Sequence, residues 1–196
     1  MRELDVAVEA LAAGAVIAVP TDTVYGLAVD PRRPGAAARL FAVKTRPEQF
    51  ALPVLIADLT ELAEIAQVSP AAYRLAARYW PGPLTLVLAR RPGLNYELGG
   101  DPSSIGVRCP ANDLVRELLR RTGPLAVTSA NLHGKAPLHT TDEVREHFEM
   151  HITVVLDGGR CDGQPSTVVS LTGPAPQCLR EGMIDFAELR ATAADS

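Results

Sequence analysis

The chain alternates short apolar runs with longer segments in which apolar residues recur every three or four positions. The recurring spacing predicts helices, and the short runs predict buried strands. We expect helices over residues 4–13, 35–43, 58–66, 69–80, 113–121, 140–147 and 185–191. We expect strands over residues 15–19, 52–57, 85–89, 105–108, 125–128, 152–156, 167–171 and 177–180. Helices and strands that alternate in this way are typical of an α/β domain, here with a mixed sheet.

Residues with a known capping preference mark several helix ends. Gly14 directly follows the first predicted helix and suits its C-terminal cap. Ser69 before Pro70 is a typical helix start, because serine caps free N–H groups and proline fits the first turn. The segments Asp58–Glu61 and Thr140–Glu143 both have the spacing of a capping box. These signals support the helices independently of their periodicity.

Length and composition bound the organisation of the chain. The 196 residues suffice for one domain with a substantial core, and 47% of them are hydrophobic. No apolar run approaches the roughly 20 residues that cross a bilayer, and the charged N-terminus does not resemble a signal peptide. Cys109, Cys161 and Cys178 are widely spaced and form no CxxC pair. We therefore expect one α/β domain over residues 1–196, a twisted mixed sheet flanked by helices, in a cytoplasmic protein with reduced cysteines.

The charge balance adds one useful contrast. The net charge of -4 argues against a protein that binds polyanions over its whole surface. Of the 19 basic residues, only Lys44 and Lys135 are lysines. A lysine ammonium and an arginine guanidinium are not equivalent in a binding site, so these two positions draw attention.

Several standard motifs are missing. The chain has no GxxxxGK[ST] loop, no GxGxxG after a strand, no GxSxG and no kinase signature. His147 and His151 are four residues apart, but the glutamate between them is wrongly placed for a zinc-binding HExxH motif. We interpret both as surface histidines and predict no metal site built from protein side chains.

Short polar segments instead fall at the ends of predicted strands, where ligand crevices of α/β sheets form. The segments are residues 21–23, 44–46, 104–108, 128–131, 166–167 and 180. Ser104, Gly106 and Arg108 share one strand face, because alternate residues do. Any one segment alone could merely stabilise a turn or a helix end. Together their hydroxyls, amides and cations suit an oxygen-rich anion, such as a nucleoside triphosphate with an amino-acid carboxylate.

The residues of these segments resemble the YrdC/TsaC family in order and spacing. The matching segments are PTDTVYGL at 20–27, KTRP at 44–47, WPGPLT at 80–85, IGVRCP at 105–110, SAN at 129–131, GK at 134–135, DGG at 157–159, STV at 166–168 and LREG at 179–182. The resemblance covers about residues 5–186 and leaves a short tail at 187–196. PTDTVYGL and WPGPLT are each fairly specific, and the ordered series is very specific.

The resemblance implies the YrdC-like α/β fold and the activity of an L-threonylcarbamoyladenylate synthase, a nucleotidyltransferase. Such an enzyme converts threonine, bicarbonate or CO2, and ATP into threonylcarbamoyl-AMP and pyrophosphate, for modification of the tRNA adenosine next to the anticodon. By resemblance, the catalytic residues are Lys44, Arg46, Ser129 and Asn131. The ATP contacts are these four together with Ser104 and Arg180. The threonine contacts are Thr23, Arg108 and Ser166.

This chemistry explains why such side chains are needed. Both reactants are anionic, so the site must offset charge and align an in-line displacement at phosphorus. Arg108 can bind the threonine carboxylate with two hydrogen bonds. We expect Mg²⁺ to be held mainly by the ATP phosphates. Asp22 is the nearest candidate for a protein ligand to this ion, and a role in stabilising its loop is at least as good an interpretation.

Two positions depart from the family pattern, and three alternative functions stay open. Phe50 and Leu55 stand where some relatives have a polar residue and a histidine, at one ATP contact and one threonine contact. The chain resembles the short synthases, which work with separate downstream threonylcarbamoyl-transfer proteins. One alternative is a paralogue with low synthase activity that binds RNA. A second is a carbamoyl-transfer module of hydrogenase maturation, which normally belongs to a larger chain. A third is a pure RNA-binding protein, against which the acidic net charge argues, although Arg120 and Arg121 offer local charge.

Overall fold

The structure is a computed structural model that describes residues 2–45, 50–131 and 136–194. Its strands form one nine-stranded sheet with the order β7-β1-β2-β6-β3-β5-β4-β8-β9. The strands are β1 Ile17–Val19, β2 Gly26–Val29, β3 Val54–Leu55, β4 Leu84–Ala89, β5 Ser104–Arg108, β6 Leu125–Ser129, β7 Val154–Val155, β8 Thr167–Ser170 and β9 Gln177–Arg180. The helices are α1 Arg2–Ala12, α2 Ala36–Lys44, the 3-10 helix η1 Leu59–Glu61, α3 Leu62–Ile65, α4 Pro70–Tyr79, α5 Asp113–Thr122, α6 Thr141–Phe148 and α7 Phe186–Ala194.

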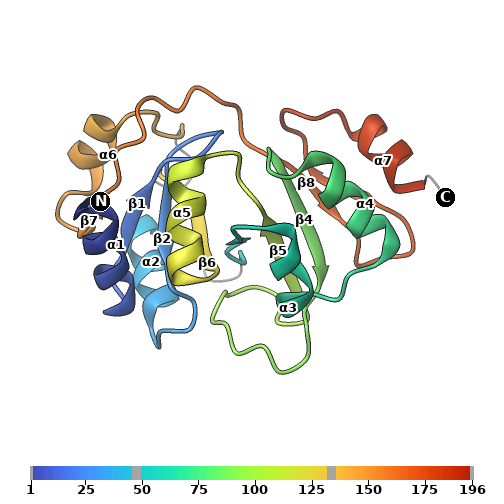
Figure 1. Cartoon of the computed structure of the whole chain (residues 1–196), viewed down its shortest axis with the longest axis horizontal. Coiled ribbons are helices and arrows are strands. Elements are labelled where there is room, and N and C mark those ends of the chain that lie inside the picture. Colours follow the sequence, from blue (N-terminus) through green and yellow to red (C-terminus); the bar gives the residue numbers. More distant parts are fainter. Residues whose placement is uncertain (1, 46–49, 132–135, 195–196) are drawn as a thin grey trace.

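The sheet is mixed and flanked by helices, which confirms the expected α/β architecture (Figure 1). β1 runs parallel to β7, β3 to β5, and β4 to β8, whereas the other neighbouring strands are antiparallel. β3, β5 and β6 connect a half that contains α1, α2, α5 and α6 with a half that contains α4 and α7 (Figure 1). No helix within the described residues is long and apolar enough to span a membrane.

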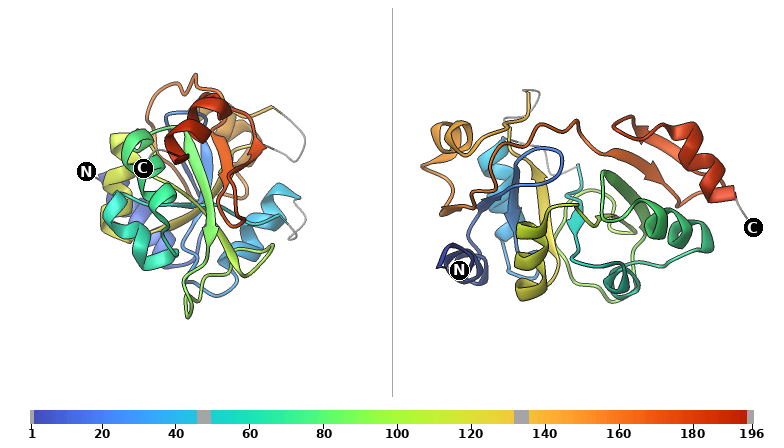
Figure 2. Two further views of the ribbon diagram at one scale, coloured as in Figure 1. Left: turned by 90° about the vertical axis from the view of Figure 1, so that its right-hand side faces the viewer. Right: turned by 45° about the horizontal axis from the view of Figure 1, so that its top comes forward.

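The two faces of the sheet bury different apolar clusters, because successive strand residues point to opposite sides. Ile17 and Val19 pack in a cluster with residues of α1 and α5. Ala18 and Leu27 pack in the other cluster, which includes Leu40 of α2. Figure 2 shows α1 and α5 on one side of the sheet and α2 on the other, and α4 packs in the same cluster as α2. The sheet is therefore covered on both faces near its centre.

The expected helix caps are present. The Ser69 side chain accepts a hydrogen bond from the Ala72 N–H at the start of α4. Both capping boxes form, at Asp58–Glu61 and at Thr140–Glu143. The first of them opens the 3-10 helix η1 before α3 continues, whereas the sequence predicted one helix over residues 58–66. Gly14 follows α1 in the left-handed conformation, with φ of 76°.

One expectation was wrong in a way that matters for the site. We expected no strand between residues 19 and 52, but β2 begins at Gly26, inside the PTDTVYGL segment, and pairs antiparallel with β1 and β6. A Cβ atom at Gly26 would lie 2.6 Å from Val127 Cγ1, so only glycine lets β2 approach β6 this closely. The motif segment is thereby tied to the middle of the sheet.

The C-terminal helix packs against α4. The Tyr79 hydroxyl donates to Glu188 Oε1 at 2.8 Å, and Arg74 Nη2 donates to the Ala193 carbonyl at 2.6 Å. Residues 187–194, which follow the family resemblance, thus belong to α7, which packs against α4.

Candidate active site

A cavity of about 470 Å³ opens between β2 and β6 on one side and β4, β5, β8 and β9 on the other; we call it the hydroxyl-lined cavity. Its polar lining residues are Thr21, Thr23, Thr85, Ser104, Arg108, Thr128, Ser129, Ser166 and Arg180. Its larger apolar lining residues are Val24, Tyr25, Phe50, Leu55, Val87, Val127, Val168 and Leu179. Within the described residues no carboxylate lines it. Hydroxyls and cations without carboxylates suit an oxygen-rich anion.

The register of the strands places the polar side chains on one face. Thr85 of β4 lies opposite Val168 of β8, and Val168 lies opposite Arg180 of β9. Val87 lies opposite Gly106 of β5. Directly paired residues point to the same face of a sheet, so four strands contribute to a single wall. The prediction that Ser104, Gly106 and Arg108 share a face is confirmed, since all three line the cavity.

Arg108 is the cation of this wall whose three guanidinium nitrogens all donate hydrogen bonds to the protein. Its Nε donates to the Gly82 carbonyl at 3.0 Å, its Nη1 to Thr23 Oγ1 at 3.1 Å and its Nη2 to Asp22 Oδ1 at 2.6 Å. Burial lowers the pKa of the guanidinium, and the charge of Asp22 opposes that shift. The side chain is therefore fixed in orientation without a ligand.

The WPGPLT segment builds the turn that supplies one of these acceptors. Trp80 Nε1 donates to the Leu84 carbonyl at 2.7 Å, and the Gly82 N–H donates to the Cys109 carbonyl at 2.9 Å. A Cβ atom at Gly82 would lie 2.3 Å from the Tyr79 carbonyl oxygen, so the turn requires glycine. This motif thus acts at the site through Arg108.

A small hydroxyl cluster orients Thr23. Thr21 Oγ1 lies 2.9 Å from Thr23 Oγ1 and accepts hydrogen bonds from the N–H groups of Thr23 and Val24. The Thr21 hydroxyl also donates to the Val24 carbonyl at 2.6 Å. Thr23 is buried, with 2% of its surface exposed, and meets Arg108 through the same oxygen. Both hydroxyls line the cavity, so this turn presents oxygens at a defined position.

Ser166 and Arg180 form a second polar group, together with Thr85. Arg180 donates from Nε and Nη2 to the Ser166 carbonyl at 3.0 and 2.9 Å, and from Nη2 to Ser166 Oγ at 2.9 Å. Ser166 Oγ also lies 2.8 Å from Thr85 Oγ1. Thr85 belongs to the WPGPLT segment, but its place beside Ser166 was not expected, because the pairing of β4 with β8 cannot be read from spacing.

Lys44 joins the other end of the site. Its Nζ donates to the Ser129 carbonyl at 2.5 Å, to Asn131 Oδ1 at 2.8 Å and to Thr128 Oγ1 at 3.4 Å. The Ser129 hydroxyl donates to Asn131 Oδ1 at 2.6 Å. Lys44 is buried, with 2% of its surface exposed, and α2 ends directly after it. Lys44 and Asn131 thus meet the cavity wall through Ser129, while Arg46 lies outside the described residues.

The structure brings most of the expected site residues together. Those that line one cavity are Thr23, Ser104, Arg108, Ser129, Ser166 and Arg180. Phe50 and Leu55 also line it, so both departures from the family pattern fall on the cavity wall. Asp22, considered as a metal ligand, instead forms an ion pair with Arg108. No group of three or more metal-binding side chains occurs within the part of the chain that the structure describes.

Tyr25 has a structural function that the sequence did not indicate. Its hydroxyl donates to the Gly159 carbonyl at 2.8 Å and accepts from the Gly158 N–H at 3.2 Å. Tyr25 is fully buried, and burial raises the pKa of its phenol. The PTDTVYGL and DGG segments, which are distant in sequence, are thereby held together.

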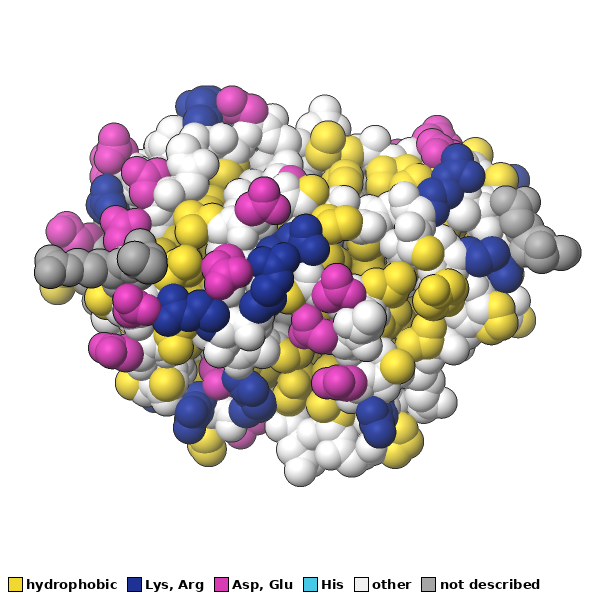
Figure 3. Space-filling view, in the orientation of Figure 1, with side chains coloured by type: hydrophobic (Ala, Val, Ile, Leu, Met, Phe, Trp, Pro, Cys, Tyr) yellow, Lys and Arg dark blue, Asp and Glu magenta, His cyan; other side chains and the backbone are white. Residues whose placement is uncertain are grey.

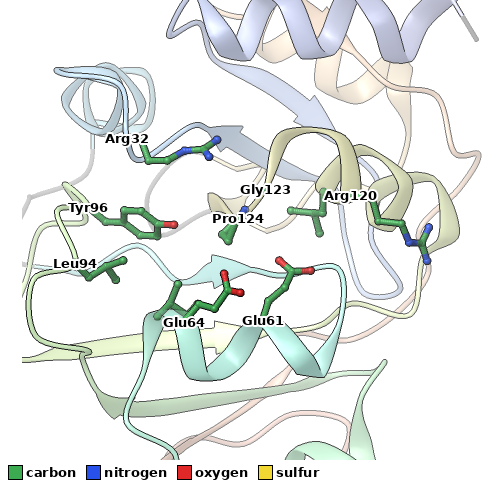
Figure 4. A pocket seen from close by; sticks show the side chains of 10 residues that line it. Arg32, Glu61, Glu64, Leu94, Tyr96, Arg120, Gly123 and Pro124 are labelled. Carbon is green, nitrogen blue, oxygen red and sulfur yellow. The ribbon is translucent and has the colours of Figure 1, made fainter.

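A second cavity, of about 400 Å³, lies beside α3 and α5. Glu61 and Glu64 point into it from η1 and α3, and Tyr96 and Arg32 lie opposite them (Figure 4). Arg32 is already paired with Asp30, its Nε 2.7 Å from Oδ1. Two carboxylates beside a neutralised arginine do not suit an anionic ligand.

On the face seen in Figure 3, basic and acidic side chains are mixed, and neither sign forms a separate patch.

The protein is an α/β protein with a mixed sheet, and its strands carry a cavity whose cations and hydroxyls suit an oxygen-rich anion. A family model for Sua5/YciO/YrdC proteins, described as "Telomere recombination", matches residues 9–182. The chain belongs to the Sua5/YciO/YrdC family.

Proteins of known name and structure agree with this assignment. A Mycobacterium tuberculosis protein that is provisionally named threonylcarbamoyl-AMP synthase is 36% identical over 180 residues, 91% of this chain and 83% of that protein. The structure of Pyrococcus abyssi Sua5 complexed with L-threonine is 34% identical with a TM-score of 0.91; the match covers 97% of this chain and 57% of that one. The structure of Escherichia coli YciO is 29% identical with a TM-score of 0.87, over 94% and 91% of the two chains. The chain thus spans little more than half the length of the Pyrococcus protein.

Proposed function

We propose that the protein is a threonylcarbamoyl-AMP synthase, which makes threonylcarbamoyl-AMP and pyrophosphate from threonine, bicarbonate or CO2, and ATP. The observation that carries the proposal is one cavity with two separate cationic groups. Arg108 with Thr23 forms one group, and Arg180 with Ser166 forms the other. A reaction between two anionic substrates needs such a pair of neighbouring sites. The names of the relatives support the same activity.

The Arg108 group suits the amino acid. A guanidinium has five N–H donors, and Arg108 uses three nitrogens on fixed acceptors, so N–H groups on Nη1 and Nη2 are left for a carboxylate. Thr23 Oγ1 beside it can bind the substrate hydroxyl or amine. The solved relative with bound L-threonine, 34% identical to this chain, supports an amino-acid ligand.

The remaining polar residues suit the nucleotide and the reacting carbamate. The threonine amine would add to CO2, and an oxygen of the resulting carbamate would attack the α-phosphorus of ATP, with pyrophosphate as the leaving group. We assign Arg180 and Ser104 to the triphosphate side. We assign Lys44, with Ser129 and Asn131, to the reacting groups, where a fixed cation stabilises developing negative charge. Arg46 belongs to the same proposal on the strength of the family motif alone.

Further expectations belong to this proposal. The reaction is a nucleotidyl transfer. Mg²⁺ would be bound mainly by the ATP phosphates and would offset their charge. The product would pass to downstream threonylcarbamoyl-transfer proteins for tRNA modification in the cytoplasm.

The decisive experiment is pyrophosphate release from ATP by the purified protein. We expect release to depend on both threonine and bicarbonate, and to be lost in Arg108→Ala. ATP hydrolysis that does not depend on threonine, or no turnover at all, would show that the proposal is wrong.

The second candidate is a paralogue that keeps the fold, has little synthase activity and binds RNA. Exposed arginines at the C-terminal end of α5, Arg120 and Arg121, favour it. Each of them, however, already contacts a carboxylate, of Glu117 and Asp5 respectively. Tight RNA binding by a protein without threonine-dependent turnover would support this candidate.

A further inference from the structure

The two arginines of the hydroxyl-lined cavity differ in the charge of their partners. Arg108 Nη2 lies 2.6 Å from Asp22 Oδ1, and the two side chains are only 8% and 13% exposed. Arg180 donates to the carbonyl and the hydroxyl of Ser166, which are neutral oxygens. Among the residues that the structure describes, Arg180 has no carboxylate within ion-pair distance. One guanidinium is therefore compensated and the other keeps its full charge.

Asp22 acts on the cavity through Arg108. It does not line the cavity, whereas Arg108 does. The ion pair has a net charge of zero, and its burial keeps solvent and salt from screening the effect of Asp22. A carboxylate ligand that binds Arg108 therefore meets a cation whose attraction is already reduced. The repulsion by Asp22 increases with the number of negative charges on the ligand, so a polyphosphate is repelled more strongly than a single carboxylate.

The two anion-binding positions adjoin each other. Arg180 Nη2 donates to Ser166 Oγ at 2.9 Å, and Ser166 Oγ contacts Thr85, whose strand β4 pairs with the strand of Arg108. Within a cavity of about 470 Å³, a polyphosphate could reach either arginine unless something distinguishes them. Hydrogen-bond geometry alone does not distinguish the two arginines, because both guanidiniums can bind a carboxylate or a phosphate.

We propose that Asp22 is a specificity-determining residue that sorts the two anionic substrates by charge. It keeps the polyphosphate away from Arg108, which then accepts a single carboxylate, and leaves the uncompensated Arg180 to the polyphosphate. This inference rests on the proposed function, because it assumes that an amino acid and a nucleoside triphosphate share the cavity.

The test is Asp22→Asn, which keeps the shape of the side chain and an acceptor for Arg108 Nη2 but removes the charge. Calorimetry with threonine, without ATP, should give a Kd about tenfold lower than in the wild type, because repulsion is lost and Arg108 lacks its counter-ion. Inorganic pyrophosphate is the second probe. In the wild type it should not compete with threonine, and in Asp22→Asn it should compete directly.

A matched control is Asp30→Asn. It removes the charge from another arginine–aspartate pair, in which Arg32 Nε lies 2.7 Å from Asp30 Oδ1. Arg32 lines the second cavity (Figure 4). We expect this variant and Asp22→Asn both to have lower thermal stability than the wild type, but Asp30→Asn should leave the threonine Kd and the pattern of pyrophosphate competition unchanged. Arg180→Ala provides an independent arm if Asp22→Asn does not fold. It should weaken pyrophosphate binding about tenfold or more and change the threonine Kd less than about twofold.

Two results would overturn the inference. One is a folded Asp22→Asn protein with the wild-type threonine Kd and no competition by pyrophosphate. The other is an Arg180→Ala protein in which threonine binding falls as much as pyrophosphate binding. Both are binding measurements, so they remain interpretable without turnover. Failure of the proposed function would appear separately, as a wild-type protein without threonine-dependent pyrophosphate release.

Discussion

Arg108→Lys is the sharpest conservative change for testing the amino-acid site. The charge remains, but one nitrogen replaces the three that contact Gly82, Thr23 and Asp22 at 3.0, 3.1 and 2.6 Å. A lysine ammonium has no planar fork and is not interchangeable with a guanidinium at a site of this geometry. It can keep the ion pair with Asp22, but it cannot hold the other two acceptors at once.

The size of the effect follows from the hydrogen bonds available to the substrate. Arg108 leaves N–H groups on two nitrogens for a carboxylate, whereas a lysine held by Asp22 offers a comparable contact from one nitrogen. A hydrogen bond to a charged group contributes about 1.5–3 kcal/mol, and each 1.4 kcal/mol is about tenfold. We therefore expect kcat/KM for threonine to fall about 10- to 150-fold, with a change in the KM for ATP below about threefold.

The assay is threonine-dependent pyrophosphate release, with threonine and ATP varied separately. Arg116→Lys is the control, since Arg116 Nε donates to the Ala57 carbonyl at 3.0 Å and does not line the cavity. Its kinetics should match the wild type. An Arg108→Lys enzyme with kcat/KM for threonine within about threefold of the wild type would falsify the assignment. So would an equal loss for threonine and ATP, since Arg108 would then serve both substrates.

Two further predictions concern Lys44 and Cys109. Lys44→Met removes the cation that contacts Ser129 and Asn131. Its kcat should fall about 100-fold or more, far more than the kcat of Lys135→Ala. Similar, mild losses of kcat in both variants would exclude Lys44 from the chemistry. Burial raises the pKa of the Cys109 thiol to about 11. Because the unfolded thiol ionises near pH 8.5, the stabilisation is complete below that pH and is lost as the pH rises to about 11. Urea unfolding between about pH 8.5 and 11 should show this decline in the free energy of unfolding. If Cys109→Ala shows a decline as steep as that of the wild type, ionisation of Cys109 is not the cause.

The sequence predicted helices better than short strands, for a physical reason. Helix ends carry local signals, and the caps at Ser69, Asp58 and Thr140 are all present. β2 carries no such signal, because it starts at a glycine that is required by the closeness of Val127 on a strand about 100 residues away. A contact of that kind is a property of the folded sheet, and local patterns do not contain it.

The same distinction between local signals and contacts of the folded sheet applies to the candidate site. The shared face of Ser104 and Arg108 followed from strand periodicity, and the cavity confirms it. The contact of Ser166 with Thr85 depends on which strands pair, and the ion pair of Asp22 with Arg108 joins a loop to a strand end. Alternation predicts the face of a residue but not its cross-strand partner. The family motifs therefore contain most of the polar residues of the cavity, and the structure was needed to show which of them contact one another.

Leu55, where the chain departs from some relatives at a threonine contact, bears on how threonine would be selected. Leu55 is buried and pairs across the sheet with Arg108, so an apolar wall adjoins the proposed amino-acid site. Such a wall separates threonine from serine by one methyl group, which is worth about 1–3 kcal/mol. Rejection of valine needs a polar partner that would be left unpaired. In this cavity the Thr23 hydroxyl can supply it, because Thr21 already orients it and it lies beside Arg108. Under the proposed function, selectivity for the threonine hydroxyl therefore rests on this oriented oxygen, and the apolar wall adds selectivity for the methyl group.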